Sequence, residues 1–83
     1  MCLSKLPNIG KELERLLNEV GITSEDELKR VGSIEATARL NAIGEACTNK
    51  LYAIEGAIKE TRWHQLPKEY RELLKKEYLE RIE

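Results

Sequence analysis

A turn at residues 6–10 constrains this chain more than any other feature, because it fixes where the first helix begins. The segment reads Leu6-Pro7-Asn8-Ile9-Gly10, and apolar residues then recur at helical spacing: Ile9, Leu13, Leu16, Leu17 and Val20. Such residues lie on one face of an α-helix, so the pattern predicts an amphipathic helix over residues 9–20. Gly21 follows at the place where a left-handed residue usually ends a helix.

The same reasoning predicts four more helices and no strand. No stretch alternates β-branched or aromatic residues with polar ones, which argues against a sheet. Ser24 and Glu27 form a capping-box pattern, Ser33 is expected to cap the third helix, and Thr48 or Asn49 the fourth. We therefore predict an all-α fold, a compact five-helix domain spanning residues 1–83. The expected helices cover residues 9–20, 25–31, 34–43, 48–61 and 67–81.

Composition limits the classes of function. Of the 83 residues 41% are apolar and 35% charged, which is too apolar for a disordered tail and too charged for a membrane span. No signal-peptide core follows Met1, so a cytoplasmic location is expected. Nucleic-acid binders usually carry a basic excess, whereas this chain has a net charge of −1. That balance counts against DNA binding as its sole function.

Few side chains suit catalysis or metal binding. Cys2 and Cys47 lie far apart without a paired-cysteine motif, and His64 is the single histidine, too few ligands for a structural zinc. We expect two reduced thiols, with Cys47 on an apolar helix face and Cys2 in a loose terminus. A disulfide or an intermolecular metal site is the alternative. Without a glycine-rich nucleotide loop or a nucleophile beside a base, we expect no enzyme activity and no cofactor.

The turn before the first helix is a candidate phosphate site. It resembles the hairpin and second helix of helix-hairpin-helix modules, in which a Gly-apolar-Gly turn exposes backbone N–H groups to a phosphate. Here Asn8 replaces the first glycine, and the preceding helix is expected to be absent or a single turn. A helix-capping role is the favoured interpretation, and phosphate or DNA binding is the alternative. That site would consist of Asn8, Ile9, Gly10, Lys11 and Arg15.

Aromatic residues near the carboxy-terminal end offer a second candidate surface. Tyr70, Leu74 and Tyr78 share one face of the last predicted helix, either as core or as an exposed stripe that binds a partner. Trp63 is expected to be a partly buried anchor between two helices, and His64 a hydrogen-bonded loop residue. Gly56, in the middle of a helix, is expected to mark a tight helix–helix crossing.

Taken in order, these segments make the chain similar to the carboxy-terminal domain of the TfoX family. The resemblance covers about residues 6–74, and its more specific parts are Leu51-Tyr52-Ala53-Ile54-Glu55-Gly56-Ala57 and Trp63-His64-Gln65-Leu66-Pro67. It implies a compact all-α domain with a helix-hairpin-helix-like core and no catalytic residues. In longer members this domain follows an α/β domain, and those proteins regulate competence for DNA uptake. Here we expect a stand-alone domain.

Two functions remain open from the sequence. The first is a small regulatory module that binds a protein partner or a second copy of itself. The second is a weak, sequence-independent DNA-binding module that uses the turn at residues 8–11 together with Arg15.

Overall fold

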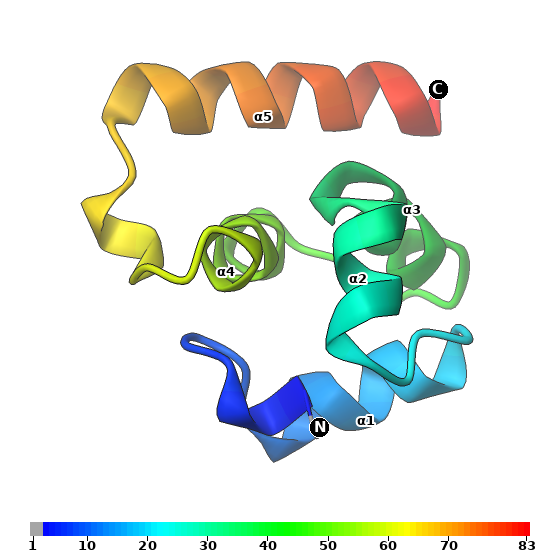
Figure 1. Cartoon of the computed structure of the whole chain (residues 1–83). Helices are drawn as coiled ribbons and strands as arrows, with labels where there is room; N and C mark the ends of the chain where they lie inside the picture. Colours follow the sequence, from blue (N-terminus) through cyan, green and yellow to red (C-terminus); the bar gives the residue numbers. More distant parts are fainter. Residues whose placement is uncertain (1–2) are drawn as a thin grey trace.

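The computed structural model describes residues 3–83, which fold into helices joined by short turns (Figure 1). Within this part of the chain there is no strand, so the predicted all-α class is confirmed. No helix here is long and apolar enough to cross a membrane. The elements in chain order are the 3₁₀-helix η1 (Leu3–Lys5), α1 (Lys11–Glu19), α2 (Glu25–Val31), α3 (Ser33–Ala42), α4 (Thr48–Ile58), the 3₁₀-helix η2 (Trp63–Gln65) and α5 (Lys68–Ile82).

Turn residues set the limits of the first helix. Asn8 has a φ of 70°, in the left-handed region that asparagine tolerates, and Gly10 is the extended N-cap residue. The first helix therefore begins at Lys11, two residues later than predicted. Gly21, the expected stop, has a φ of 86° and accepts the reversal of the chain without steric cost. Before the turn, the chain forms only the single 3₁₀ turn η1, as anticipated.

The predicted caps are confirmed at one helix and wrong at two others. The Ser24 hydroxyl accepts a hydrogen bond from the backbone N–H of Glu27 at 3.2 Å, which satisfies an otherwise unpaired donor at the start of α2. Ser33 is instead the first residue of α3, and its hydroxyl donates away from its own helix. The N-cap of α4 is Cys47, one residue before the expected Thr48, and its side chain makes no capping bond.

The main core lies between η1 and α1 through α4. Leu17, Ile22, Leu28 and Leu40 are completely buried, and together they join α1, α2 and α3. The apolar stripe predicted for the first helix is confirmed, since Leu13 and the residues three and four positions on all face this core. The complete cluster comprises Leu3, Leu6, Ile9, Leu13, Leu16, Leu17, Ile22, Leu28, Ala36, Leu40, Ala53, Ile54 and Ala57.

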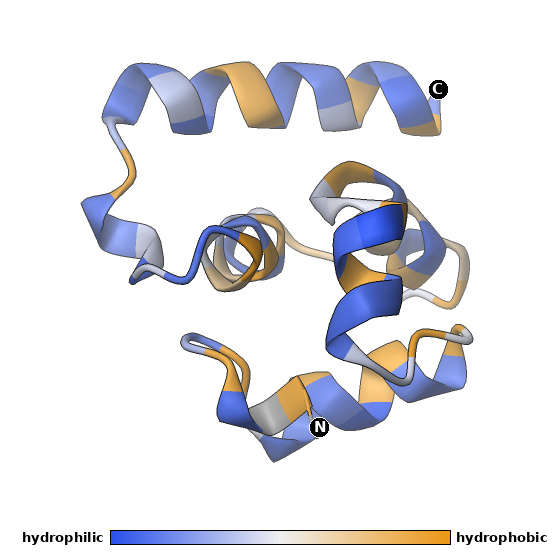
Figure 2. Cartoon of the chain, viewed as in Figure 1, coloured by the Kyte–Doolittle hydropathy of each residue, from blue (hydrophilic) through white to orange (hydrophobic). Residues whose placement is uncertain are grey.

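α5 covers a second, smaller cluster. Figure 1 shows α5 across one side of the molecule and α1 on the opposite side, with α4 seen nearly end-on between them. The buried members of this cluster are Leu51 of α4 and Leu74 and Tyr78 of α5. Most of α5 is hydrophilic, as Figure 2 shows, so one narrow face holds the helix on the rest of the fold.

Candidate functional site

The side chain of Asn8 is bonded to backbone groups of the protein itself. Its Nδ2 donates to the carbonyl oxygen of Thr61 at 2.8 Å and, over a longer distance of 3.5 Å, to that of Ala53. Its Oδ1 accepts the backbone N–H of Trp63 at 3.2 Å. One asparagine thus ties the amino-terminal turn to the end of α4 and to η2. These contacts support the structural role of the turn that the sequence favoured over phosphate binding.

Gly56 provides the space for that connection. A Cβ at this position would lie 2.5 Å from Nδ2 of Asn8 and 2.8 Å from the carbonyl oxygen of Thr61. Such distances are too short for any non-bonded carbon, so a larger residue would displace the turn. The predicted close approach is therefore present, but it is made by a side chain and a loop and not by a second helix.

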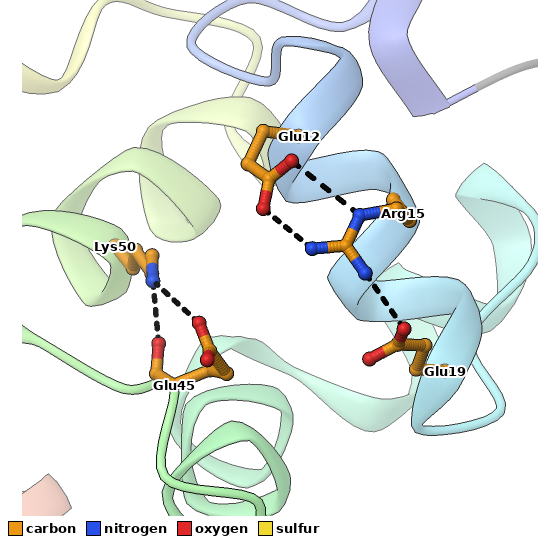
Figure 3. Close-up of polar contacts among 5 residues, drawn as sticks. All are labelled: Glu12, Arg15, Glu19, Glu45 and Lys50. Carbon is orange, nitrogen blue, oxygen red and sulfur yellow. Dashed lines mark hydrogen bonds and ion pairs between the residues drawn. The ribbon is translucent and has the colours of Figure 1, made fainter.

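The other residues of the predicted phosphate site are only partly available. Ile9 is buried in the main core, whereas Gly10 and Lys11 are exposed. Arg15 is held between two carboxylates of its own helix, 2.6 Å from Glu12 and 2.7 Å from Glu19 (Figure 3). These ion pairs offset the charge of Arg15, so Lys11 is the remaining cation of the predicted phosphate site that has no ion pair in the described residues.

Electrostatic effects agree with this pairing. The hydrogen bond from Arg15 lowers the pKa of Glu12, and the same contact raises the pKa of Arg15. Across from α1, Lys50 lies beside Glu45 and donates to its carbonyl oxygen at 2.6 Å (Figure 3). This side of the molecule is a mixed-charge surface, which is a poor match for a polyanion.

The predicted stripe of Tyr70, Leu74 and Tyr78 is not an exposed surface in this chain. Leu74 and Tyr78 are each only 5% exposed, and Tyr70 is partly buried beside them. The spacing of these three residues does place them on one face of α5, but this face packs on α3 and α4. A mostly charged helix has only this face to bury, so the core interpretation holds and the exposed stripe was wrong.

A buried carboxylate that sequence reasoning missed joins three helices. Glu55 of α4 is only 9% exposed; the Ser33 hydroxyl of α3 donates to it at 2.6 Å, and the Tyr70 hydroxyl of α5 donates to its other oxygen. Lys59 lies 3.9 Å away, one helical turn later. Burial and the bond to Glu55 raise the pKa of Tyr70 to about 12. A lone acidic residue within the apolar run of residues 53–57 was the signal for this cluster.

Three partly exposed side chains gather where α4, η2 and α5 meet. The rings of Tyr52 and Trp63 are stacked with their centroids 6.0 Å apart. The guanidinium carbon of Arg71 lies 5.9 Å from the centroid of Tyr52 and 5.7 Å from that of Trp63. We call Tyr52, Trp63 and Arg71 the aromatic–arginine cluster. The prediction of Trp63 as a partly buried anchor is confirmed, and exposed His64 contacts its ring edge-on at 6.1 Å.

A shallow depression of about 340 Å³ lies between α3 and the end of α5. Three of its charged groups are already paired, because Glu35 accepts hydrogen bonds from Arg39 at 3.3 Å and from Arg81 at 2.7–3.0 Å. The bond from Arg81 is the main cause that lowers the pKa of Glu35. This network ties α5 to α3 and uses the charges of Glu35, Arg39 and Arg81 within the fold. Arg81 thus pairs with Glu35 of α3 and not with Glu77, four residues earlier on its own helix.

The thiols and potential metal ligands do not form a site in residues 3–83. Cys47 is a free, exposed cysteine at the start of α4, so its predicted place on an apolar face was wrong. The chain passes into α4 there in an extended conformation, which turns the side chain outward. Cys2 lies outside the described residues. In the part of the chain that the structure covers, no three His, Cys, Asp or Glu side chains meet in a way that could hold a metal ion.

Comparison with known proteins gives one family and three solved chains, including two from Listeria monocytogenes. An uncharacterised protein from Listeria monocytogenes, solved in a triclinic crystal form, is 44% identical, with a TM-score of 0.88 over 96% of this chain and 92% of that one. A protein of unknown function from the same organism, in a tetragonal form, is 46% identical, with a TM-score of 0.85 over 94% of this chain and 96% of that one. No functionally curated protein matches. The TfoX C-terminal domain model matches residues 2–78, nearly the whole length, and the chain therefore belongs to the TfoX C-terminal domain family.

Proposed function

We propose that this chain is a small, non-catalytic regulatory module that binds a protein partner or a second copy of itself. The observation that supports this proposal is the aromatic–arginine cluster. Tyrosine, tryptophan and arginine are the residue types that contribute most to protein–protein binding energy, especially where they lie together. Here one of each remains partly exposed on three adjoining elements.

Membership of the TfoX C-terminal domain family supports a regulatory setting for this module. The resemblance to the longer family members, which regulate competence for DNA uptake, extends the proposal to that process. A binding module without chemistry of its own also fits the small size of the domain, because an 83-residue chain has room for one modest core and little else.

Weak DNA binding through the amino-terminal turn is the less favoured function. That turn uses the Asn8 side chain internally, and the charge of Arg15 is offset by two glutamates. A phosphate would find Lys11 and the N–H groups at the start of α1, but little additional positive charge. Partner binding therefore remains the function that the geometry favours.

The proposal is tested with the purified chain in two assays. Light scattering measures self-association, and the chain immobilised as bait captures partners, which are then purified and titrated back against it. We expect Trp63→Ala to weaken the measured interaction by at least about tenfold, the effect of losing a central aromatic contact. Leu79→Ala, an exposed apolar residue elsewhere on α5, is the matched control and should leave the affinity unchanged.

Two results would contradict the proposal. One is a strictly monomeric chain for which no captured protein binds again in purified form. The other is an interaction that Trp63→Ala and Leu79→Ala affect equally, while circular dichroism shows both variants folded. Binding of duplex DNA that strengthens steeply as the salt concentration falls would favour the DNA-binding function instead.

A further inference from the structure

Positive charge is concentrated along one flank of α5. Lys68, Arg71 and Lys75 follow one another at intervals of three and four residues, which places them on the same side of a helix. Within residues 3–83, none of the three makes an ion pair, whereas six other basic side chains do. We call Lys68, Arg71 and Lys75 the α5 cation flank.

Arg71, at the centre of the flank, lacks the anionic partner that an arginine in its position normally has. Its Nε is buried and has no hydrogen-bond partner. Its guanidinium group lies beside the rings of Tyr52 and Trp63, which hold its plane in place. A guanidinium group fixed in this way has lost part of its hydration and much of its rotational freedom, so it is prepared to bind a carboxylate through two parallel hydrogen bonds.

The amino-terminal end of α5 also attracts negatively charged groups such as carboxylates. Pro67 is the N-cap residue and has no side-chain acceptor, so no side chain of the described residues caps the first N–H groups of this 15-residue helix. The amino-terminal end of a helix carries a partial positive charge. Side chains on a helix lean toward its amino-terminal end, and the guanidinium group of Arg71 accordingly lies beside Trp63 of η2. The helix end and the arginine therefore attract the same kind of ligand.

We propose that the α5 cation flank, together with the rings of Tyr52 and Trp63, binds an acidic segment of a protein partner. The inference rests on the proposed function and names the chemistry of the partner. Carboxylates of the segment pair with Arg71 and the two lysines, and its apolar side chains lie against the exposed parts of the rings. The lysines stand about 10 Å apart along the helix, a span that three or four residues of an extended peptide cover.

A short acidic segment fits this surface better than a nucleic acid does. Nucleic-acid affinity grows with the number of phosphates neutralised, and only three unpaired cations line this flank of a chain with a net charge of −1. Glu69 lies on another side of the same helix, whereas Glu72, four residues after Lys68, borders the flank, and both would repel a long polyanion that wraps around α5. A peptide with two or three carboxylates engages the three cations while meeting less of this repulsion than a long polyanion does.

Trp63 reports directly on this site, because it is the single tryptophan of the chain. We propose to titrate the full chain with a blocked hexaglutamate peptide at low ionic strength, and to follow tryptophan fluorescence. Blocked hexaglutamine is the uncharged control peptide. A saturable change with hexaglutamate and none with hexaglutamine is the expected result.

Paired variants separate the flank from general charge effects. Lys68→Gln with Lys75→Gln removes two exposed charges of the flank and should weaken hexaglutamate binding about tenfold. Lys11→Gln with Lys76→Gln removes the same charge from exposed positions elsewhere and should change binding less than about twofold. Arg71→Gln should abolish the fluorescence change, with circular dichroism as a check that α5 still forms.

Each of three outcomes would overturn the inference: no response to hexaglutamate, equal weakening by the two paired variants, or tighter binding of a single-stranded oligonucleotide of the same charge. If hexaglutamate fails while a purified partner still depends on Trp63, the proposed function stands and only the acidic chemistry is wrong. If neither binds, both are wrong.

Discussion

At the scale of single residues, two polar side chains connect segments that lie far apart in the sequence. Asn8 connects the amino-terminal turn to the loop after α4, and Glu55 connects three helices through Ser33 and Tyr70. Both sit inside or beside apolar surroundings, where a polar group without partners would cost about 1–3 kcal/mol. Full hydrogen bonding makes each of them a determinant of one specific packing arrangement.

The pKa of Tyr70 predicts how stability depends on pH. A tyrosine in an unfolded chain has a pKa of about 10, and the folded value is raised to about 12 by burial and by Glu55. The folded state therefore holds the phenol proton more tightly. Its contribution, at most about 3 kcal/mol, is complete below pH 10 and is lost as the pH rises toward 12.

Urea unfolding between pH 8 and pH 11.5 measures this dependence. We expect the free energy of unfolding to fall more steeply above pH 10 in the wild type than in Tyr70→Phe, which has no phenol to ionise. The variant lacks the bond to Glu55 at every pH, so it is less stable at pH 8 and the two curves converge with rising pH. If the two curves of unfolding free energy against pH stay parallel over this range, the ionisation of Tyr70 does not cause the pH dependence of stability.

At the scale of elements, Gly56 shows that a helix can require glycine in its interior although glycine has a low helix propensity. Replacing a mid-helix glycine by alanine normally adds up to about 1 kcal/mol of stability. Here the new Cβ would collide with Nδ2 of Asn8 and the carbonyl of Thr61, so we expect Gly56→Ala to lose about 2 kcal/mol in urea unfolding. A Cβ at Gly10 would meet nothing, so Gly10→Ser, which supplies an N-cap side chain, should instead raise the free energy of unfolding by roughly a few tenths of a kcal/mol.

A double variant tests the cause of that loss. Asn8→Gly removes the nearest colliding atom and keeps the left-handed backbone that Asn8 adopts, at the cost of its hydrogen bonds. In this background, Gly56→Ala should cost clearly less than in the wild type, with a coupling of about 1 kcal/mol. Simple additivity would mean that the collision with Thr61 alone, or another strain, accounts for the effect.

The sequence predicted elements well because their signals are local. Apolar spacing and glycine stops located α1 to α5 to within a few residues, since both depend on neighbours along the chain. Prediction from the sequence failed where a residue contacts another that lies far away along the chain. Ser33 bonds to Glu55 instead of capping its own helix, and Gly56 faces Asn8. Such contacts depend on how the helices are placed in space, which periodicity does not encode.

At the scale of the whole molecule, the same limit explains the candidate sites. Spacing identified the face of α5 that carries Leu74 and Tyr78, but a face that binds a partner and one that packs on the domain have the same pattern. The aromatic–arginine cluster combines residues from three elements. Neither its formation nor the missing partner of Arg71 could be read from one segment.

The division of the core into two clusters predicts that α5 opens before the rest of the fold. Only Leu74 and Tyr78 of this 15-residue helix are buried, whereas α1 through α4 share the larger cluster. A terminal helix held by few apolar contacts forms a unit of low local stability. In native-state hydrogen exchange, we therefore expect the amides of α5 to show a lower opening free energy than those of α3 and α4.

Two core variants separate this local opening from global unfolding. Leu74→Ala should lower the opening free energy of α5 amides by about 2–4 kcal/mol and change those of α1 much less, because α5 can detach while the main core stays folded. Leu40→Ala, in the main core, should lower the free energy of global unfolding, to which the slowest amides of α1 to α4 respond together. If both variants shift every amide equally, the domain unfolds as one unit and α5 is not separable. In that case, the α5 cation flank would be as rigid as the core beneath it.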